Sequence, residues 1–320
     1  MGIIEFKDLK KSFWSREGGK KKEVEAVNGI SLSIDEGEVF GFLGPNGAGK
    51  TTTQRMLATL LPIDSGVATI AGFDVKKRPN EVREIIGYVG QMGGTDNFAT
   101  GKENLILQGR LYKMDRDDIE KSAERLIELF DLKDIVDRLA KTYSGGQKRR
   151  LEVALGLIHD PRILFLDEPT AGLDPQNRAN LWNHIKELKQ RGMTVLLTTH
   201  YLDEADKLCD RIAIIDNGGI VAVGTPKELK DKIAGETIKI EVETDLDTGT
   251  VAELFRDEPY VRETRTDGKF VHLIVDEGAT ALPKIFEILK NENITAKSIS
   301  MAKPTLDDVF LKMTGRSLRD

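Results

Sequence analysis

The sequence predicts an α/β fold with a parallel sheet, an antiparallel β layer and a helical subdomain, followed by a small α+β domain. Strand-like apolar runs alternate with helical segments up to about residue 224, which is the pattern of a parallel sheet. The order then becomes βαββαβ, which is typical of a ferredoxin-like domain. A chain of 320 residues, 39% apolar and 31% charged, is long enough for two globular domains. We place their boundary near residue 235, giving domains 1–235 and 236–320.

The first domain opens with two strand-like segments, residues 3–13 and 23–34, which flank a polar loop and predict the antiparallel layer. A buried strand, "EVFGFLG", ends at a glycine-rich turn, and the helix that follows is expected to run until Pro62 stops it. Residues 101–130 are mostly helical, and they predict a helical subdomain at about 101–142. The remaining elements are predicted as strands at 85–91, 163–168, 194–200, 211–217 and 219–224, and as helices at 144–160 and 175–192.

The second domain is predicted from shorter segments. Its strands are expected at residues 237–243, 260–267, 269–276 and 294–301, and its helices at 248–257 and 280–293. A last helix at 304–315 is expected to present one apolar face made of Leu306, Val309, Phe310 and Met313. The order of these elements predicts the ferredoxin-like split pattern.

Composition narrows the possible functions. The net charge of −6 does not favour non-specific nucleic-acid binding. No apolar run approaches the roughly 18 residues that a membrane helix needs, and the N-terminus lacks the apolar core of a signal peptide. The one cysteine, Cys209, rules out an internal disulfide, fits a reducing cytosol and is expected to be a small core residue.

The glycine-rich turn carries the strongest motif in the chain. "GPNGAGKT" fits the pattern G-x-x-x-x-G-K-[ST] and lies between a predicted strand and a predicted helix, the context that a phosphate-binding loop requires. Its backbone N–H groups would surround the phosphates, Lys50 would reach the β- and γ-phosphates, and Thr51 would ligate Mg²⁺. The predicted nucleotide contacts are Gly44, Pro45, Asn46, Gly47, Ala48, Gly49, Lys50, Thr51 and Thr52.

Two carboxylates end another apolar strand, "ILFLDEP". We expect Asp167 to hold Mg²⁺, through water, and Glu168 to accept hydrogen bonds from the attacking water as the general base. Burial would raise the pKa of Glu168 and Mg²⁺ would lower it, so the sequence leaves the direction open. A pair of solvated charges at a loop edge is the structural alternative.

Three further residues are predicted near the same place. Gln91 and His200 each follow an apolar strand, and the carboxyl ends of parallel strands share one edge of a sheet. His200 could donate to the γ-phosphate, and Gln91 could bind Mg²⁺ or the water. At the end of the first strand, either Phe13 or Trp14 could stack on an adenine ring; we choose Phe13, with core packing as its alternative.

A second anion-binding pattern begins at Ser144. "SGGQ", formed by Ser144, Gly145, Gly146 and Gln147, opens a helix whose first amides lack intrahelical acceptors. Because the glycine-rich loop already supplies the phosphate site within the chain, we expect the second pattern to close on a nucleotide held by another copy. Two copies related by a twofold axis would then form two composite sites. A helix N-cap without a ligand is the alternative.

In this order the motifs resemble those of the ATP-binding cassette (ABC) ATPases, over residues 1 to about 230. The resemblance implies a P-loop NTPase domain with Walker A at 44–51, the Q-loop at Gln91, the signature at 144–147, Walker B at Asp167 with catalytic Glu168, the D-loop around Asp174 and the switch His200. Tyr143 replaces the usual Leu of the signature, and Phe13 stands where Tyr is common. Both replacements are aromatic or apolar, so ATP binding is still expected.

The stretch from Tyr143 onward and the ending "KPTLDDVFLKMTGR" look more narrowly like ATPase subunits of daunorubicin-resistance, antibiotic and sodium exporters. This resemblance implies a homodimer that sandwiches ATP and Mg²⁺, binds a separate membrane permease and lies peripherally on the cytoplasmic face of the membrane. Two alternatives remain: an importer ATPase whose C-terminal domain senses a ligand, and an ABC ATPase outside transport. For residues 236–320 we favour a dimerisation domain over a sensor. The transported substrate is not given by the sequence.

Overall fold

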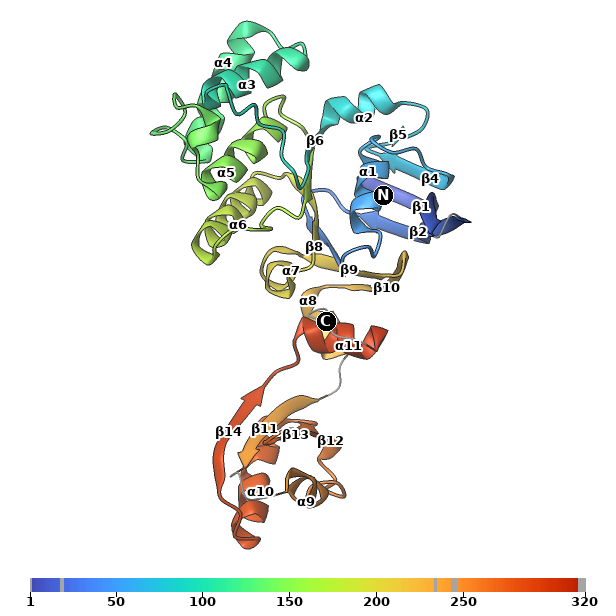
Figure 1. The fold of residues 1–320 in the computed structure, drawn as a ribbon, viewed down its shortest axis with the longest axis vertical. Coiled ribbons are helices and arrows are strands. Elements are labelled where there is room, and N and C mark those ends of the chain that lie inside the picture. The colour runs from blue at the N-terminus through green and yellow to red at the C-terminus, as the bar shows by residue number, and fades with distance from the viewer. Residues whose placement is uncertain (1, 18–19, 233–234, 243–246, 316–320) are drawn as a thin grey trace. The chain divides into compact units, whose positions relative to one another are not determined.

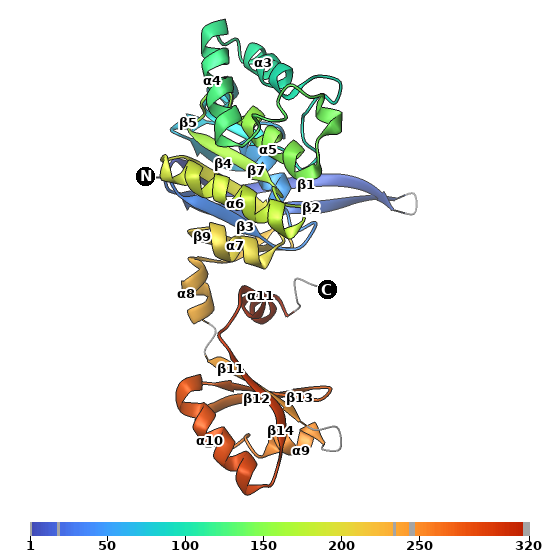
Figure 2. The same cartoon turned by 90° about the vertical axis from the view of Figure 1, so that its left-hand side faces the viewer.

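The chain folds into two compact units, residues 1–226 and 227–320, in a computed structural model that describes residues 2–17, 20–232, 235–242 and 247–315. Figure 1 labels the elements of both units, and Figure 2 shows them turned by 90°. The units divide at the start of α8 (Pro226–Asp231), whereas the boundary expected near residue 235 follows that helix. That domain boundary stays a prediction.

The core of the first unit is a six-stranded sheet of order β10-β9-β3-β8-β7-β6, in which only β10 pairs antiparallel with its neighbour. Every residue of β3, β7 and β8 is buried, because helices and a second sheet cover both faces. This burial explains the largely apolar sequences of β3 and β7 and the apolar run 195–197 of β8, whose three threonines are buried as well. The strands are β3 (Val39–Leu43), β6 (Ile86–Val89), β7 (Ile163–Asp167), β8 (Thr194–Thr199), β9 (Arg211–Asp216) and β10 (Gly219–Gly224).

The antiparallel layer that the sequence predicts is a second sheet of order β2-β1-β4-β5. Its apolar face shares one hydrophobic cluster with α1 and with Phe40 and Phe42 of β3. The sequence analysis found its two long strands and missed the two short ones. The strands are β1 (Ile4–Glu17), β2 (Lys20–Ile34), β4 (Ser65–Ile70) and β5 (Phe73–Asp74).

Helices surround the parallel sheet, and α3 and α4 lie together as the predicted helical subdomain (Figure 1). One predicted helix is too long: α1 ends at Leu57, and Thr59 adopts a left-handed backbone with φ of 63° before Pro62 is reached. Asp174, the N-cap residue of α6, accepts a hydrogen bond from the backbone amide of Asn177. The helices are α1 (Lys50–Leu57), α2 (Pro79–Ile85), α3 (Gly101–Leu111), α4 (Arg116–Leu129), α5 (Gly145–Gly156), α6 (Pro175–Gln190) and α7 (Leu202–Leu208).

The second unit has the predicted βαββαβ order, and its antiparallel sheet has the strand order β12-β13-β11-β14. Helices α9 and α10 cover one face of this sheet (Figure 2), and residues of all these elements form its core. On α11, Leu306, Val309 and Phe310 are buried as expected, whereas Met313 is 38% exposed. The elements are β11 (Glu236–Val242), α9 (Thr248–Glu253), β12 (Val261–Asp267), β13 (Phe270–Val275), α10 (Gly278–Asn291), β14 (Ala296–Ala302) and α11 (Leu306–Thr314).

Two further expectations from the sequence concern the burial of Cys209 and the presence of membrane-spanning helices. Cys209 is buried, as expected for a small core residue. Among the residues that the structure describes, no helix has the length and apolar character that a bilayer crossing requires.

Candidate functional site

The glycine-rich loop joins β3 to α1 at the carboxyl edge of the parallel sheet. Gly49 has a φ of 103°, and a Cβ there would lie 2.3 Å from the Ala26 carbonyl oxygen of β2, so only glycine fits. The loop is also tied to the turn before β10, because the Gly218 amide donates to the Ala48 carbonyl over 3.0 Å. The Asn28 amide of β2 donates to the Gly218 carbonyl over 2.8 Å. The loop, β2 and that turn therefore form one hydrogen-bonded body.

Lys50, the first residue of α1, is held inside this loop. Its ammonium donates to the Gly44 and Pro45 carbonyls over 2.7 and 2.9 Å, and its Nζ lies 3.9 Å from Glu168 Oε1. Burial lowers the pKa of Lys50, and the charges of Glu168 and Asp167 act against that shift. Lys50 thus presents a positive charge, only 4% exposed, at the point where the loop would receive phosphates.

Asp167 ends β7 and faces the start of α1. Its Oδ1 accepts hydrogen bonds from the hydroxyls of Thr51 and Thr198, each over 2.7 Å. Its Oδ2 is buried and has no hydrogen-bond partner. A buried carboxylate oxygen without a partner, beside a threonine hydroxyl, is the oxygen-donor arrangement that suits Mg²⁺. The described residues therefore fit this ion.

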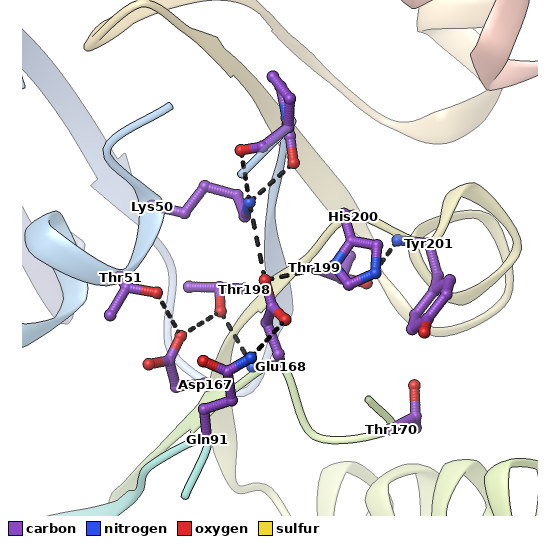
Figure 3. Close-up of polar contacts among 12 residues, drawn as sticks. Lys50, Thr51, Gln91, Asp167, Glu168, Thr170, Thr198, Thr199, His200 and Tyr201 are labelled. Carbon is purple, nitrogen blue, oxygen red and sulfur yellow. Dashed lines mark hydrogen bonds and ion pairs between the residues drawn. The ribbon is translucent and has the colours of Figure 1, made fainter. Parts of the chain in front are cut away.

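Glu168 lies at the centre of the polar cluster in Figure 3. Its Oε2 accepts a hydrogen bond from Gln91 Nε2 over 3.1 Å, and its Oε1 lies 3.3 Å from His200 Nδ1. This ring nitrogen is buried and does not have the geometry of a hydrogen bond to the carboxylate. Lys50, Gln91 and His200 thus approach one carboxylate from three different strand ends, as the sequence predicted for a parallel sheet.

The backbone of Glu168 is unusual. Its φ is 45°, a left-handed conformation that a residue with a side chain adopts at a cost of about 1–2 kcal/mol. Its amide donates to both the carbonyl and the hydroxyl oxygen of Thr198, over 3.1 and 3.0 Å. This turn after β7 allows the consecutive carboxylates of Asp167 and Glu168 to serve one site, although adjacent residues of a regular strand point to opposite faces.

A cavity of about 440 Å³ opens over this cluster. Its walls combine the glycine-rich loop with the side of the antiparallel layer and with Gln91 and Glu168. Phe13 lines it and is 40% exposed, whereas neighbouring Trp14 is 68% exposed and is not part of the wall. The lining residues are Phe13, Ala26, Asn46, Gly47, Gly49, Lys50, Thr51, Thr52, Gln91 and Glu168.

The second anion-binding pattern lies elsewhere. Ser144 caps α5 through a capping box: its hydroxyl accepts from the Gln147 amide, and the Gln147 side chain accepts from the Ser144 amide. Ser144 and Gly145 are exposed, and none of residues 144–147 lines the cavity. The structure therefore separates the two predicted phosphate sites within one chain.

One residue in this cluster was missed by the sequence analysis. Thr198, fully buried on β8, donates to the Asp167 carboxylate and accepts from the Glu168 backbone amide, so it connects the candidate metal ligand to the candidate general base. The available signal was weak: a threonine near the end of an apolar strand, one of two consecutive threonines before His200. Only the register of β7 against β8, which pairs Asp167 with Thr198, identifies its position.

Behind the cluster, α7 buries a carboxyl group completely. Glu204 Oε1 accepts hydrogen bonds from Thr170 Oγ1 over 2.8 Å and from Trp182 Nε1 over 3.0 Å, whereas Oε2 has no hydrogen-bond partner. Burial raises the pKa of Glu204 above 4.5, although the hydrogen bonds act in the opposite direction. Folding therefore favours the protonated form of this group.

The raised pKa of Glu204 predicts a pH effect on stability. The wild-type protein should lose stability as pH rises from about 4.5 to the raised folded pKa, because in this range the unfolded state has lost the proton that the native state still holds. Glu204→Gln keeps the oxygen that accepts both hydrogen bonds and cannot ionise. The Tm of the variant relative to wild type should therefore be higher at about pH 8 than at about pH 5. Parallel Tm profiles, such as those expected for exposed Glu124→Gln on α4, would contradict this interpretation.

Comparisons with known proteins complete the description. The family model described as "ABC transporter" matches residues 27–171, and the one described as "ATP-binding protein DrrA1-3-like, C-terminal domain" matches residues 224–314. A daunorubicin resistance ATP-binding protein of Streptomyces coeruleorubidus is 44% identical over 92% of this chain and 91% of its own. The linearmycin resistance ATP-binding protein of Bacillus subtilis is 36% identical over 99% of this chain and 100% of its own.

Among solved structures, the fold matches a dimeric ATP-binding cassette in a post-hydrolysis state, bound to ADP and phosphate. The TM-score is 0.62 at 25% identity, covering 70% of this chain and 98% of the cassette. The match thus spans nearly the whole of that cassette.

Proposed function

The chain belongs to the ABC transporter family of ATP-binding proteins, with a DrrA1-3-like C-terminal domain, and from this premise we propose that it hydrolyses ATP to drive export through a separate membrane permease. The protein is an ATP hydrolase of the ABC type. The observation that carries the proposal is the convergence of Lys50, Gln91 and His200 on Glu168 at the edge of the cavity.

The nucleotide would occupy the cavity with its base near Phe13 and its phosphates in the loop of residues 44–52. Lys50 is positioned for the β- and γ-phosphates because its ammonium is already held at the loop by two carbonyls. Thr51 and Asp167 would hold Mg²⁺, with Gln91 as a further ligand or a contact to the water. When bound, the ion neutralises charge that develops on the phosphate oxygens.

In hydrolysis, a water oxygen forms a bond to the γ-phosphorus while the bond from that phosphorus to the β–γ bridging oxygen breaks. Glu168 is the proposed general base, and its carboxylate takes the proton that the attacking water loses. ADP leaves with the bridging oxygen. His200 would donate a hydrogen bond to the γ-phosphate, and Lys50 would stabilise its charge. If the site closes around the nucleotide and excludes water, the interactions of His200 and Lys50 with the γ-phosphate would become stronger.

We further propose a head-to-tail homodimer in which the "SGGQ" residues of each copy close on the nucleotide held by the other. The exposure of Ser144 and Gly145 and their absence from the cavity wall support this arrangement. The helix N-terminus would place the free amides of Gly145 and Gly146 against the γ-phosphate. The similar cassette structure that is dimeric in a post-hydrolysis state supports the same arrangement.

Complementation between two inactive variants tests the composite site. Lys50→Ala removes the phosphate-loop lysine, and Ser144→Arg places a bulky cation at the signature. Each variant alone should be inactive. A mixed dimer contains one site with both defects and one with neither, so an equal mixture should recover up to about one quarter of wild-type ATPase activity. If the mixture stays inactive although mixed dimers are isolated with two affinity tags, each site is built within one chain.

A separate permease and a peripheral position on the cytoplasmic face of the membrane complete the proposal. The relatives named for daunorubicin and linearmycin resistance support an exporter role. The tagged full chain should co-purify with an integral membrane protein from detergent-solubilised membranes. Co-purification with ribosomes instead would favour an ABC ATPase that works outside transport.

For the second unit we retain dimerisation as the proposed role. Two arginines that line a cavity of about 490 Å³ in this unit form ion pairs within the unit: Arg265 pairs with Glu263, and Arg262 pairs with Asp276. These pairs leave less positive charge available to a small anionic ligand than two free arginines would. Thermal-shift screening of the full chain with amino acids should give no shift, and a saturable rise in Tm would support the ligand-sensing alternative.

A further inference from the structure

We propose that Arg149 is a positioning residue that holds the general base Glu168 in its left-handed backbone conformation and connects it to the signature helix. This inference relies on the proposed role of Glu168 and adds a residue that the nucleotide motifs do not include. Arg149 lies on α5, two residues after the "SGGQ" sequence, and is 6% exposed. Its guanidinium therefore faces the protein interior.

The first observation is that Arg149 binds the backbone on both sides of Glu168. Its Nη2 donates to the Asp167 carbonyl over 3.1 Å, and its Nε donates to the Pro169 carbonyl over 2.8 Å. Glu168, between these two carbonyls, has the left-handed φ of 45°. A strained residue keeps its conformation only when its surroundings fix it, and these two hydrogen bonds fix the peptide group directly before Glu168 and the peptide group that follows Pro169.

The second observation joins the same guanidinium to Gln91. Arg149 Nη1 donates to the carbonyl of Gly90, the residue before Gln91, over 2.8 Å. Gln91 in turn donates to the Glu168 carboxylate over 3.1 Å. Arg149 thus holds the backbone next to the base Glu168. It also holds the backbone next to Gln91, whose side chain orients the Glu168 carboxylate.

Glu152, one turn along α5, completes this buried group. Its Oε2 lies 3.0 Å from Arg149 Nη1, and both side chains are less than 10% exposed. A Cβ at Gly93 would lie 2.0 Å from Glu152 Oε1, so the loop that carries Gln91 packs directly on this carboxylate. The pair neutralises the buried charge of Arg149, which would otherwise be costly in the interior.

The chemistry of these contacts requires arginine. A guanidinium has several N–H donors in a rigid plane and can serve the carbonyls of Asp167, Pro169 and Gly90 together with the Glu152 carboxylate. A lysine carries the same charge on one compact ammonium, which cannot occupy all these directions. Arg149→Lys therefore preserves the charge and removes the arrangement.

The location on α5 gives the contact a role in coupling. The N-terminus of this helix carries the residues proposed to bind the nucleotide of the second copy. A movement of α5 on engagement would be transmitted by a rigid guanidinium to Glu168 and Gln91. Arg149 would in this way adjust the base of its own chain when its signature meets nucleotide.

The test compares Arg149→Lys with Arg150→Lys in the full chain by steady-state and single-turnover ATP hydrolysis. Arg150, the next residue of α5, donates to the carbonyls of Phe130 and Asp131 in the helical subdomain and does not contact the base. Arg149→Lys should lower kcat about 10- to 100-fold, as expected for a displaced reacting group, with KM changed less than about threefold. Equal kcat values for the two variants would overturn the proposal.

A double-mutant cycle separates positioning of the base from a general loss of structure. In a Glu168→Gln background, Arg149→Lys should lower the residual rate by less than about twofold, because there is no base left to position. The same loss in both backgrounds would overturn the proposal. If Glu168→Gln by itself hydrolyses ATP normally, the general-base assignment of Glu168 fails. This result does not depend on any Arg149 variant, so it is distinguishable from failure of the Arg149 proposal.

A milder variant covers the case in which Arg149→Lys does not fold. Glu152→Gln keeps the shape of the side chain and removes the charge that anchors the guanidinium. It should lower kcat about three- to tenfold with little change in KM, and this effect should disappear in the Glu168→Gln background. Wild-type kcat in Glu152→Gln, when Arg149→Lys is unfolded, would overturn the proposal.

Discussion

Replacing Glu168 with Gln is expected to slow ATP hydrolysis by about 10²- to 10⁴-fold while ATP-dependent dimerisation remains intact. The amide has nearly the same size as the carboxylate and can still accept the hydrogen bond from Gln91 on its oxygen. It cannot take up the proton of the attacking water. Slow turnover should then allow the ATP-bound dimer to accumulate.

Two measurements check this prediction separately. Phosphate release gives the rate, and size-exclusion chromatography with light scattering, at saturating ATP and Mg²⁺, gives the oligomeric state. Glu124→Gln, an exposed change on α4, is the matched control and should behave like wild type. Normal hydrolysis in Glu168→Gln would refute the base assignment. A variant that stays monomeric under these conditions would refute the composite dimer.

Lys50→Ala is expected to abolish detectable ATP binding, with Kd raised by at least about 100-fold. The loss removes a buried ammonium that would make charge-assisted hydrogen bonds to two phosphates, each worth about 1.5–3 kcal/mol. About 3 kcal/mol in total corresponds to a change of roughly 100-fold in Kd. The lysine is already oriented by the Gly44 and Pro45 carbonyls, so little ordering entropy opposes its binding to phosphate.

Equilibrium binding of a fluorescent ATP analogue measures this effect directly. Lys207→Ala, an exposed change on α7, is the matched control and should retain wild-type affinity. The Tm of Lys50→Ala without nucleotide is expected to be lower than that of wild type, because the buried Gly44 carbonyl loses its donor and Glu168 loses its cation, so binding is measured well below that Tm. Retention of normal affinity in Lys50→Ala would exclude the assigned phosphate contact.

Much of the fold could be predicted from the sequence because several strands of the parallel sheet are fully buried. β3, β7 and β8 are buried along their whole length, so each contains an uninterrupted apolar run, although β8 also has three buried threonines. β4 and β5 were missed because β4 is half-exposed with glycine at its second position and β5 has only two residues. The end of α1 was missed because the left-handed Thr59 has no signature in its amino-acid type.

The candidate site likewise contains residues that could be predicted from the sequence and residues that could not. Lys50, Asp167, Glu168, Gln91 and His200 could be placed together because each follows a strand of one parallel sheet. The alternation of strand residues separates Phe13, which lines the cavity, from Trp14, which does not. Their roles in catalysis and binding stay predictions.

Arg149 and Thr198 could not be found in this way. Their partners are mainly backbone groups, which every residue possesses, so no pattern of side chains marks them. In the sequence, Arg149 is one of three consecutive basic residues, and its burial distinguishes it only in three dimensions.

The hydrogen bonds that join the phosphate loop to β2 and to the turn before β10 affect how the protein discriminates between ATP and ADP. Strand β2 pairs with β1, which carries Phe13, so the wall beside the base and the cradle for the phosphates keep a constant separation. ADP and ATP would meet identical surroundings from the ring to the second phosphorus. A single subunit should consequently hold both with similar strength, and discrimination must arise from the groups around the terminal phosphate, including those lent by a second copy.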